Sequence, residues 1–148
     1  MEELELQRRF SAMDEVTFRG HPMVRSLHPT TIEVTTATHL TERGDCIIGV
    51  GASKGCSDLD RGVKARLQSG APAIITIVVE KETYTVRCSG DPRLELSHPD
   101  DMVIRKSEFV SDRTLALRAD SAAKDIPRSM VRKLRDPAAR GTMEIRVA

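Results

Sequence analysis

The chain is 148 residues long and 39% apolar, which is enough for one domain with a hydrophobic core of its own. Its 23 Lys and Arg side chains nearly balance its 22 Asp and Glu side chains, so the charge gives no long-range attraction to nucleic acid or to acidic membranes. With no Trp, one Tyr and three Phe, the sequence also argues against a platform on which the bases of single-stranded nucleic acid stack.

The cysteines and the apolar runs bear on the compartment. Cys46, Cys56 and Cys88 form an odd set without a repeated spacing, which is typical of reduced thiols. The first residues carry several charges and lack the apolar stretch of a signal peptide. The longest apolar run, at 73–79, is too short to span a bilayer. We therefore expect a cytoplasmic protein that does not associate with membranes.

Residues 1–13 are expected to form a tail or a short helix, and residues 14–148 a single folded domain. Within that domain, apolar and polar residues alternate in several segments, which places one face of each strand on a core and the other face in water. Half-buried strands of this kind are typical of antiparallel sheets. The alternating segments lie at 16–19, 31–35, 83–88, 114–118 and 142–147.

Two further segments, 46–50 and 74–79, are apolar on both faces and predict central strands. A hairpin turn at 80–82 is expected to follow the second of them. Short strands are also expected at 93–96 and 102–106. A set of about nine short strands separated by turns predicts a mainly β fold, an antiparallel β-sandwich. No internal repeat of solenoid length is apparent.

Two short helices complete the predicted fold. The first begins at Ser57, and Leu59, Val63 and Leu67 fall on its buried face. The second begins at Pro127, whose missing N–H suits a first helical turn, and a short turn at 120–124 precedes it. Because strands do not alternate with helices along the chain, a doubly wound parallel sheet is not expected.

Three of the four histidines stand directly before a proline, which holds the backbone of the preceding residue extended. These are His21, His28 and His98, and the last is followed by Asp100 and Asp101. An imidazole beside a carboxylate can run acid–base chemistry near pH 7 or bind a metal ion. None of them has the spacing of a zinc motif, so no metal ligands are assigned, and a shared metal or catalytic site stays an open alternative. The alternative interpretation is that histidines at bends only cap turns.

A charged turn precedes the buried strand at 46–50. In it, Arg43 is a candidate contact for an anion, and Asp45 is a candidate base or ligand. Alternatively, Asp45 hydrogen-bonds to its own backbone and only stabilises the turn. We interpret Cys46 as a core residue, because a nucleophilic cysteine needs a nearby base and a lowered pKa.

Basic residues also follow one another in the second predicted helix. A solvated helix face explains such a run in most proteins, and contact with an RNA backbone is the alternative. The residues that would make this contact are Arg128, Arg132, Lys133 and Arg135.

Three long stretches of the chain are distinctive: LTERGDCIIGV at 40–50, HPDDMVIRKS at 98–107 and RTLALRADSAA at 113–123. With these stretches, the chain from about residue 16 to its end resembles the archaeal domain-of-unknown-function family number 371. The resemblance implies an archaeal cytosolic protein with a jelly-roll-like β-sandwich. It implies no activity.

These observations lead to three hypotheses about function. In the first, the protein is a binding module for a small anionic ligand or an RNA element; Arg43, Arg105, Lys106 and Arg113 supply positive charge, and His21, His28 and His98 orient the ligand. In the second, it is a hydrolase or transferase with His28 or His98 as general base and with Asp45 or Asp101 orienting that base or holding a metal. In the third, it is a structural or interaction protein in which the same polar residues lock turns. Neither a cofactor nor an oligomeric state is predicted.

Overall fold

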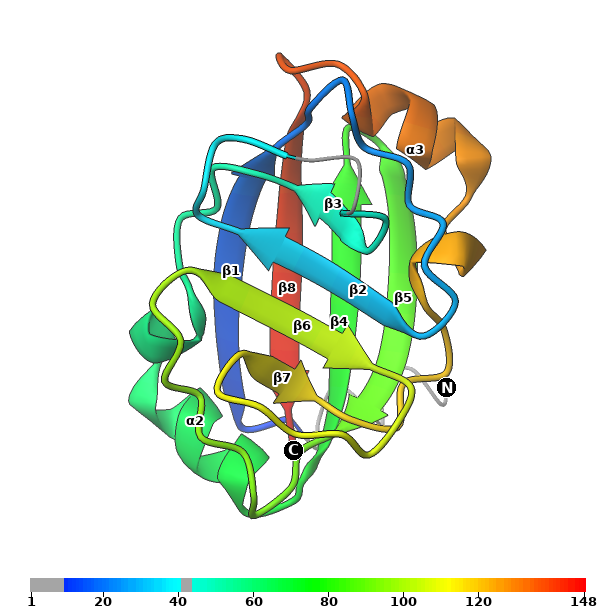
Figure 1. Cartoon of the computed structure of the whole chain (residues 1–148). Helices are drawn as coiled ribbons and strands as arrows, with labels where there is room; N and C mark the ends of the chain where they lie inside the picture. The colour runs from blue at the N-terminus through cyan, green and yellow to red at the C-terminus, as the bar shows by residue number, and fades with distance from the viewer. Residues whose placement is uncertain (1–9, 41–43) are drawn as a thin grey trace.

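The computed structural model describes residues 10–40 and 44–148. Eight strands, two α-helices and two 3-10 helices follow one another in this part of the chain (Figure 1). In chain order they are β1 (Ala12–Arg19), β2 (Thr31–Thr35), β3 (Ile47–Gly49), η1 (Cys56–Asp58), α2 (Arg61–Gln68), β4 (Pro72–Val79), β5 (Glu82–Ser89), β6 (Asp101–Arg105), β7 (Thr114–Ala116), η2 (Ala123–Asp125), α3 (Arg128–Leu134) and β8 (Arg140–Val147).

The strands form two sheets of four. The first sheet has the order β1-β8-β4-β5, and every neighbouring pair in it is antiparallel. The second has the order β3-β2-β6-β7, in which the central pair is antiparallel and the two outer pairs are parallel. The expected mainly β fold is therefore confirmed, but antiparallel pairing throughout is wrong for β2–β3 and β6–β7. The jelly-roll topology implied by the resemblance is not confirmed.

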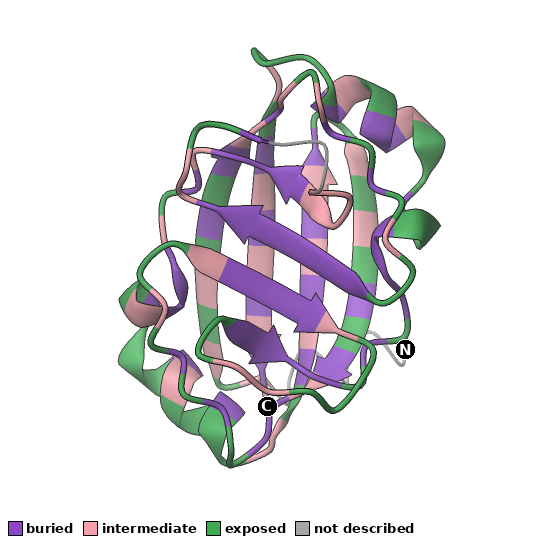
Figure 2. Ribbon diagram, in the orientation of Figure 1, coloured by how far each residue is buried: buried purple, intermediate pink, exposed green. Residues whose placement is uncertain are grey.

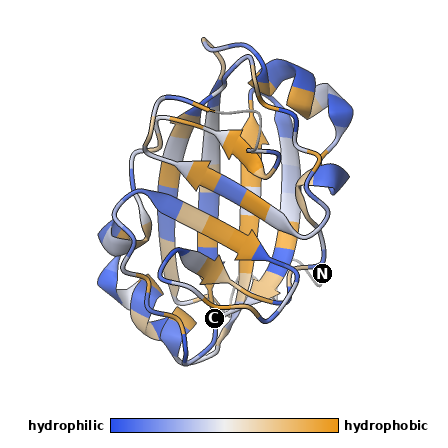
Figure 3. Ribbon diagram, in the orientation of Figure 1, coloured by the Kyte–Doolittle hydropathy of each residue, from blue (hydrophilic) through white to orange (hydrophobic). Residues whose placement is uncertain are grey.

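The two sheets share one hydrophobic core, and the second lies in front of the first in Figure 1. Strands of the first sheet alternate between buried and exposed residues, as half-buried strands do. By contrast, all five residues of β2 are buried, and so are the middle residues of β6 (Figure 2). Hydrophilic residues interrupt the apolar residues of β2 (Figure 3). The second sheet thus has polar side chains covered on its outer face.

The described parts of the chain form two halves with the same order of elements. Residues 12–79 and residues 82–147 each run through three strands, a 3-10 helix, an α-helix and a final strand. Details repeat as well. Ser26 and Leu96 both have a positive φ, of 53° and 50°. The isolated bridge between Arg19 and Val50 in the first half recurs between Ser89 and Leu117 in the second.

The halves are also interlocked, because each contributes a helix that closes the loop of the other. The amide of His21, in the loop after β1, donates to the carbonyl of Leu134 at the end of α3 (2.8 Å). The amide of Asp91, in the loop after β5, donates in the same way to Leu67 of α2 (2.8 Å). Gly20 and Gly90 permit this approach, since a Cβ at either would lie within 2.4 Å of a helix carbonyl oxygen. Each repeated half spans most of 12–79 or 82–147, which is longer than one unit of a solenoid repeat, so the absence of a solenoid repeat in the sequence does not conflict with it.

Several predicted boundaries need correction. The strand expected at 93–96 is wrong: Leu94 and Leu96 are buried in irregular chain, and the positive φ of Leu96 does not fit a strand. The first helix begins at Arg61 rather than Ser57, because Asp60 caps it by accepting from the amide of Val63.

At the second helix the expected start is one residue early, since Pro127 is the N-cap and the helix begins at Arg128. The expected turn at 120–124 corresponds to η2. Of the expected N-terminal tail, residues 1–9 lie outside the described part, and β1 begins at Ala12. Over the described ranges, no helix combines the length and apolar composition needed to cross a bilayer.

Candidate functional site

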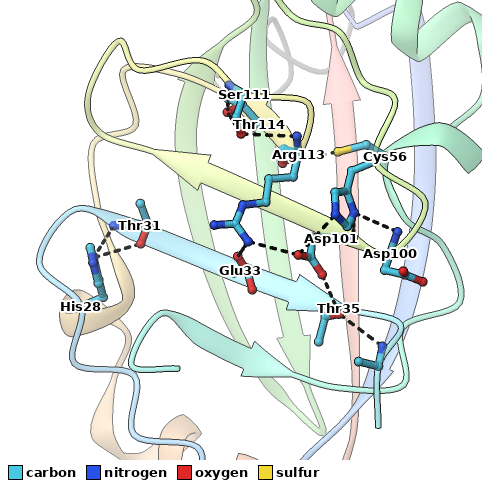
Figure 4. Close-up of polar contacts among 12 residues, drawn as sticks. His28, Thr31, Glu33, Thr35, Cys56, Asp100, Asp101, Ser111, Arg113 and Thr114 are labelled. Carbon is cyan, nitrogen blue, oxygen red and sulfur yellow. Dashed lines mark hydrogen bonds and ion pairs between the residues drawn. The ribbon is translucent and has the colours of Figure 1, made fainter. Parts of the chain in front are cut away.

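The outer face of the central strands β2 and β6 carries a group of charged side chains around a buried carboxyl, that of Glu33. Core residues of these strands alternate with residues that point away from the first sheet. Arg113, at the entrance to β7, reaches over the same face (Figure 4). We call Glu33, Asp101, Arg105 and Arg113 the outer-face cluster.

Glu33 lies at the centre of the cluster and is only 6% exposed. Its Oε1 atom lies 3.8 Å from Nη1 of Arg113. Burial raises the pKa of Glu33 to about 7, and the nearby negative charge of Asp101 adds to this, while Arg113 and Arg105 oppose it. The carboxyl is therefore close to half protonated at neutral pH.

Asp101 joins the two strands to Arg113. Its Oδ2 atom lies 3.2 Å from Nη1 of Arg113, and its Oδ1 atom accepts a hydrogen bond from the hydroxyl of Thr35 at 2.7 Å. Thr35 is the direct cross-strand partner of Asp101 in the β2–β6 register. The Arg113 guanidinium thus lies between two carboxyl groups, those of Glu33 and Asp101 (Figure 4).

Arg105 is held differently, by hydroxyl groups and an aromatic ring. Its Nε donates to Thr114 (2.8 Å), its Nη2 donates to Ser111 (3.2 Å), and its guanidinium lies 4.9 Å from the ring centroid of Phe109. Burial lowers the pKa of Arg105, and the positive charge of Arg113 lowers it further. Among the described residues, no carboxylate forms an ion pair with Arg105.

Cys46 lies next to this cluster. Burial raises the pKa of its thiol, and the negative charge of Glu33 raises it further. Because the thiolate is the nucleophilic form, this environment favours our interpretation of Cys46 as a structural residue.

The three histidines before proline all accept backbone hydrogen bonds. Nδ1 of His21 accepts from the amide of Met23 (3.0 Å), and Nδ1 of His28 accepts from Thr31 (3.1 Å). Nδ1 of His98 accepts from the amide of Asp101 (2.8 Å). A backbone N–H can only donate, so Nδ1 is the acceptor in each ring and the neutral ring carries its proton on Nε2. This geometry corresponds to the turn-capping alternative.

The structure does not bring His28 and His98 together. Each stands three residues before its strand, and the strands are antiparallel, with Thr31 opposite Arg105 and Thr35 opposite Asp101. The two rings therefore lie at opposite ends of a five-residue ribbon, roughly 13 Å long at about 3.3 Å per residue. His98 belongs to the Asp101 end, where its Nε2 lies 3.8 Å from Oδ2 of Asp101. In the described ranges, no group of three or more His, Cys, Asp or Glu side chains could hold a metal ion.

The other predicted site residues lie apart from the cluster or outside the described residues. The backbone carbonyl of Asp45 accepts from the amides of Leu27 and His28, which places Asp45 at the His28 end. Its Oδ1 atom is buried and has no hydrogen-bond partner in the described structure. The side chain of Lys106 is exposed, and Arg43 lies outside the described residues.

The basic run on α3 is divided by its contacts. The guanidinium of Arg128 donates to several backbone carbonyls, among them that of Ser26 at 2.8 Å, and so stabilises the fold. Lys133 forms ion pairs with Glu82 (2.9 Å) and Glu80. Arg132 and Arg135 are exposed, as Arg128 is, but no carboxylate in the described ranges forms an ion pair with either of them.

Sequence reasoning did not predict Glu33 as a site residue. Its position in an alternating segment assigned it to a water-facing side, and alternation cannot show that other chain segments cover that side. A Glu in the middle of a strand of β-branched residues was the available signal.

Comparisons with known proteins show what the chain is similar to. Residues 16–148 match the model of a family described as "Domain of unknown function (DUF371)". The chain is also 42% identical over 118 residues to "Uncharacterized protein MJ0206" of Methanocaldococcus jannaschii, an alignment that covers 80% of this chain and 87% of that protein. The family model covers most of the chain, and the expected resemblance is confirmed. The protein therefore belongs to the DUF371 family.

Proposed function

We propose that the outer-face cluster binds a small anionic ligand, with Arg105 and Arg113 as its positive contacts. The observation that carries this proposal is the environment of Arg105, a partly buried guanidinium that is held by hydroxyl groups and lowered in pKa by a second guanidinium. An anion between the two would offset both the burial and the repulsion. Guanidinium groups bind carboxylate and phosphate oxygens in pairs, which makes these the expected ligand groups.

Glu33 would then control binding through its protonation state. With a pKa of about 7, it is mostly protonated below neutral pH, where it can donate a hydrogen bond to an anionic oxygen. Above neutral pH it is ionised, pairs with Arg113 and repels the anion. Ligand affinity should therefore fall as the pH rises through about 7.

Titration calorimetry with inorganic phosphate, pyrophosphate and citrate, each at pH 6 and pH 8, tests the proposal. We expect at least one of these anions to bind, and to bind more weakly at pH 8. The Arg105→Met variant, which retains much of the apolar stem, should bind about tenfold more weakly or worse, in line with the loss of one charged hydrogen-bonding group.

Arg87→Met is the matched control, because Arg87 is an exposed arginine on β5 of the other sheet. It should leave the affinity unchanged. If none of the three anions binds, or if Arg105→Met and Arg87→Met bind alike, the proposal is wrong. Because the three anions themselves gain negative charge between pH 6 and pH 8, the variant Glu33→Gln is the reference for the contribution of Glu33: relative to it, the wild type should lose affinity at pH 8, and an equal pH dependence of the two proteins would remove Glu33 from the site.

A second candidate function, acid–base catalysis, is supported by the pKa of Glu33. A carboxyl with a pKa near 7 is suited to take up or give a proton at neutral pH. In this version Glu33 replaces His98 as the base, since Nδ1 of His98 is already occupied by backbone amides, and Asp101 orients Arg113. A panel of phosphate and carboxylate esters would test it: Glu33→Gln should abolish turnover and still bind the anionic product.

A further inference from the structure

A cleft of about 370 Å³ lies between the chain at 24–27 and α3, which are side by side in Figure 1. Its apolar wall is made by Val24, Leu27 and Val131, and the side chain of Leu27 is 55% exposed. Arginines surround that wall from both segments. We call this the arginine cleft.

The arginines of the cleft have two kinds of role. Arg128 donates its hydrogens to carbonyls of the chain at 25–26 and of η2, and so builds the floor. Arg25, Arg132 and Arg135 line the cleft and are exposed. Among the described residues, no carboxylate forms an ion pair with any of these three. Three cations thus converge on one exposed apolar side chain.

The second half of the chain shows that the fold does not require this arrangement. The counterparts of Arg25 and Leu27 are Glu95 and Ser97, and the counterpart of Arg132 on α2 is Ala65. The counterpart of Arg135 is Gln68, whose side-chain amide donates to the carbonyl of Leu94 (3.1 Å) and so ties α2 to the loop. The same order of elements is therefore built without these three arginines and without the exposed leucine, although Arg61 and Lys64 stand where the arginine cleft has Arg128 and Val131, and a structural role does not account for the three arginines or the leucine.

We propose that the arginine cleft docks a segment of a partner protein in which a bulky apolar side chain is flanked by carboxylates. The apolar wall would bury the side chain, and the three unpaired guanidiniums would pair with the carboxylates, an arrangement in which arginine is often a strong contact. An RNA strand fits less well. Among the residues that the structure describes, none that lines the cleft offers an aromatic ring for a base, and three cations on a chain of net charge +1 can neutralise few phosphates.

A differential peptide selection tests this partner class. A displayed library of random peptides is selected on the wild-type protein after depletion on the Arg132→Glu/Arg135→Glu double variant. We expect the enriched peptides to combine Asp or Glu with Leu, Ile, Phe or Met. A fluorescein-labelled synthetic copy of one such peptide, measured by polarisation, should bind the double variant at least tenfold more weakly than the wild type.

Three controls keep the proposal falsifiable. Arg61→Glu/Arg66→Glu makes the same charge change on the exposed side of α2 and should leave the affinity unchanged. Leu27→Ser should weaken the peptide several-fold, because the apolar contact is lost while the charges stay. A labelled oligouridylate should bind no better than a control peptide that lacks the selected arrangement of charges.

Absence of acidic–apolar enrichment, equal loss in the control double variant, or tighter binding of the oligouridylate would each overturn the proposal. Arg105→Met, which tests the outer-face cluster, should bind the peptide normally.

Discussion

The two halves of the molecule have the same order of elements but different side chains at the positions that matter for chemistry. Glu33 of β2 corresponds to Val103 of β6, and Asp101 corresponds to Thr31. Arg113, before β7, corresponds to Cys46, before β3. The outer-face cluster therefore takes its carboxyls and guanidiniums from positions that are not equivalent, and neither half could form it alone. Residues that recur in both halves are therefore the ones that the fold requires, while the charged residues of the cluster, which do not recur, belong to the site.

The core residues of the two halves also differ, but the differences in side-chain volume compensate one another. In the first half, the ring of Phe18 packs on Gly49 and Gly141, where a Cβ would lie 2.1 and 2.3 Å from ring atoms. In the second half, Cys88 occupies the place of Phe18, and its corresponding neighbours are Ala116 and Ala73. One large and two small residues in one half thus replace three intermediate ones in the other, with little change in backbone.

The largest expected effect comes from breaking that complementarity. Phe18→Cys should lower the free energy of unfolding by about 3 kcal/mol, because Phe18 is 1% exposed and its loss leaves a cavity. Gly49→Ala alone should also destabilise, since its methyl group would overlap the ring of Phe18. Urea denaturation measures both changes.

The triple variant Phe18→Cys/Gly49→Ala/Gly141→Ala reproduces the composition of the second half. We expect it to be more stable than the sum of its single changes predicts, by about 1–3 kcal/mol, because the two methyl groups fill the space that the ring leaves. Strict additivity would mean that the two added methyl groups do not fill the space left by the ring. The exchange of one large and two small residues for three intermediate ones would then not explain how both halves pack.

The next effect concerns the asymmetric charge on β2. Folding raises the pKa of Glu33 from 4.5 to about 7, so the folded protein binds more protons than the unfolded chain between these values. Stability should consequently fall as the pH rises from about 4.5 to about 7. Glu33→Gln should remove this slope and should be more stable than the wild type at pH 8 by about 3 kcal/mol, since each unit of a pKa difference corresponds to about 1.4 kcal/mol.

Glu82→Gln provides a control of opposite sign. Hydrogen bonds from Lys133 and Ser129 lower the pKa of this half-buried carboxyl, so it contributes stability above its ordinary pKa that is lost on acidification. Its replacement should lower the free energy of unfolding by a constant amount above the acid range and should change the slope of stability against pH only within the acid range. If Glu33→Gln leaves the slope between pH 4.5 and 7 intact, the carboxyl of Glu33 is not the group that responds to pH.

Local sequence patterns were enough for much of this architecture but not for its pairing. The alternation at Val16 and Phe18 and the turn at Glu80 identified β1 and the β4–β5 hairpin. The strand expected at 93–96 failed because Leu94 and Leu96 alternate like a strand while the chain bends at a positive φ. β3 and β7 have three residues each, and nothing local shows that such short strands pair in parallel.

The repeat left a faint signal in the sequence. Gly20-x-Pro22 and His28-Pro29 recur with the same spacing as Gly90-x-Pro92 and His98-Pro99. These are backbone-determining positions, and most side chains between them differ. For the site, Asp101, Arg105 and Arg113 could be named in advance as polar residues, but the burial of Glu33 depends on segments that no local pattern places beside it.

The smallest expected change in stability comes from one position with a positive φ, which a different residue occupies in each half. Gly51 has φ +58° at the position where the second half has Arg118 with φ +54°. In the first half, the guanidinium of Arg19 covers Gly51. In the second, the guanidinium of Arg118 itself pairs with Asp91 (2.9 Å) and Glu108 (2.8 Å).

A non-glycine residue in the left-handed region costs about 1 kcal/mol, while exposed ion pairs contribute between about 0 and 1 kcal/mol each. Arg118→Gly removes the cost of the left-handed backbone but also loses the ion pairs, so its free energy of unfolding should stay within about 1 kcal/mol of the wild type. Arg118→Ala loses the ion pairs and keeps the strained backbone, and it should be about 1 kcal/mol less stable than Arg118→Gly. Gly51→Ala should lose a similar amount, because the guanidinium of Arg19 can move aside and only the backbone term remains. Equal stability of Arg118→Ala and Arg118→Gly in urea denaturation would show that the conformation at this position carries no strain, and that arginine and glycine are interchangeable here for another reason.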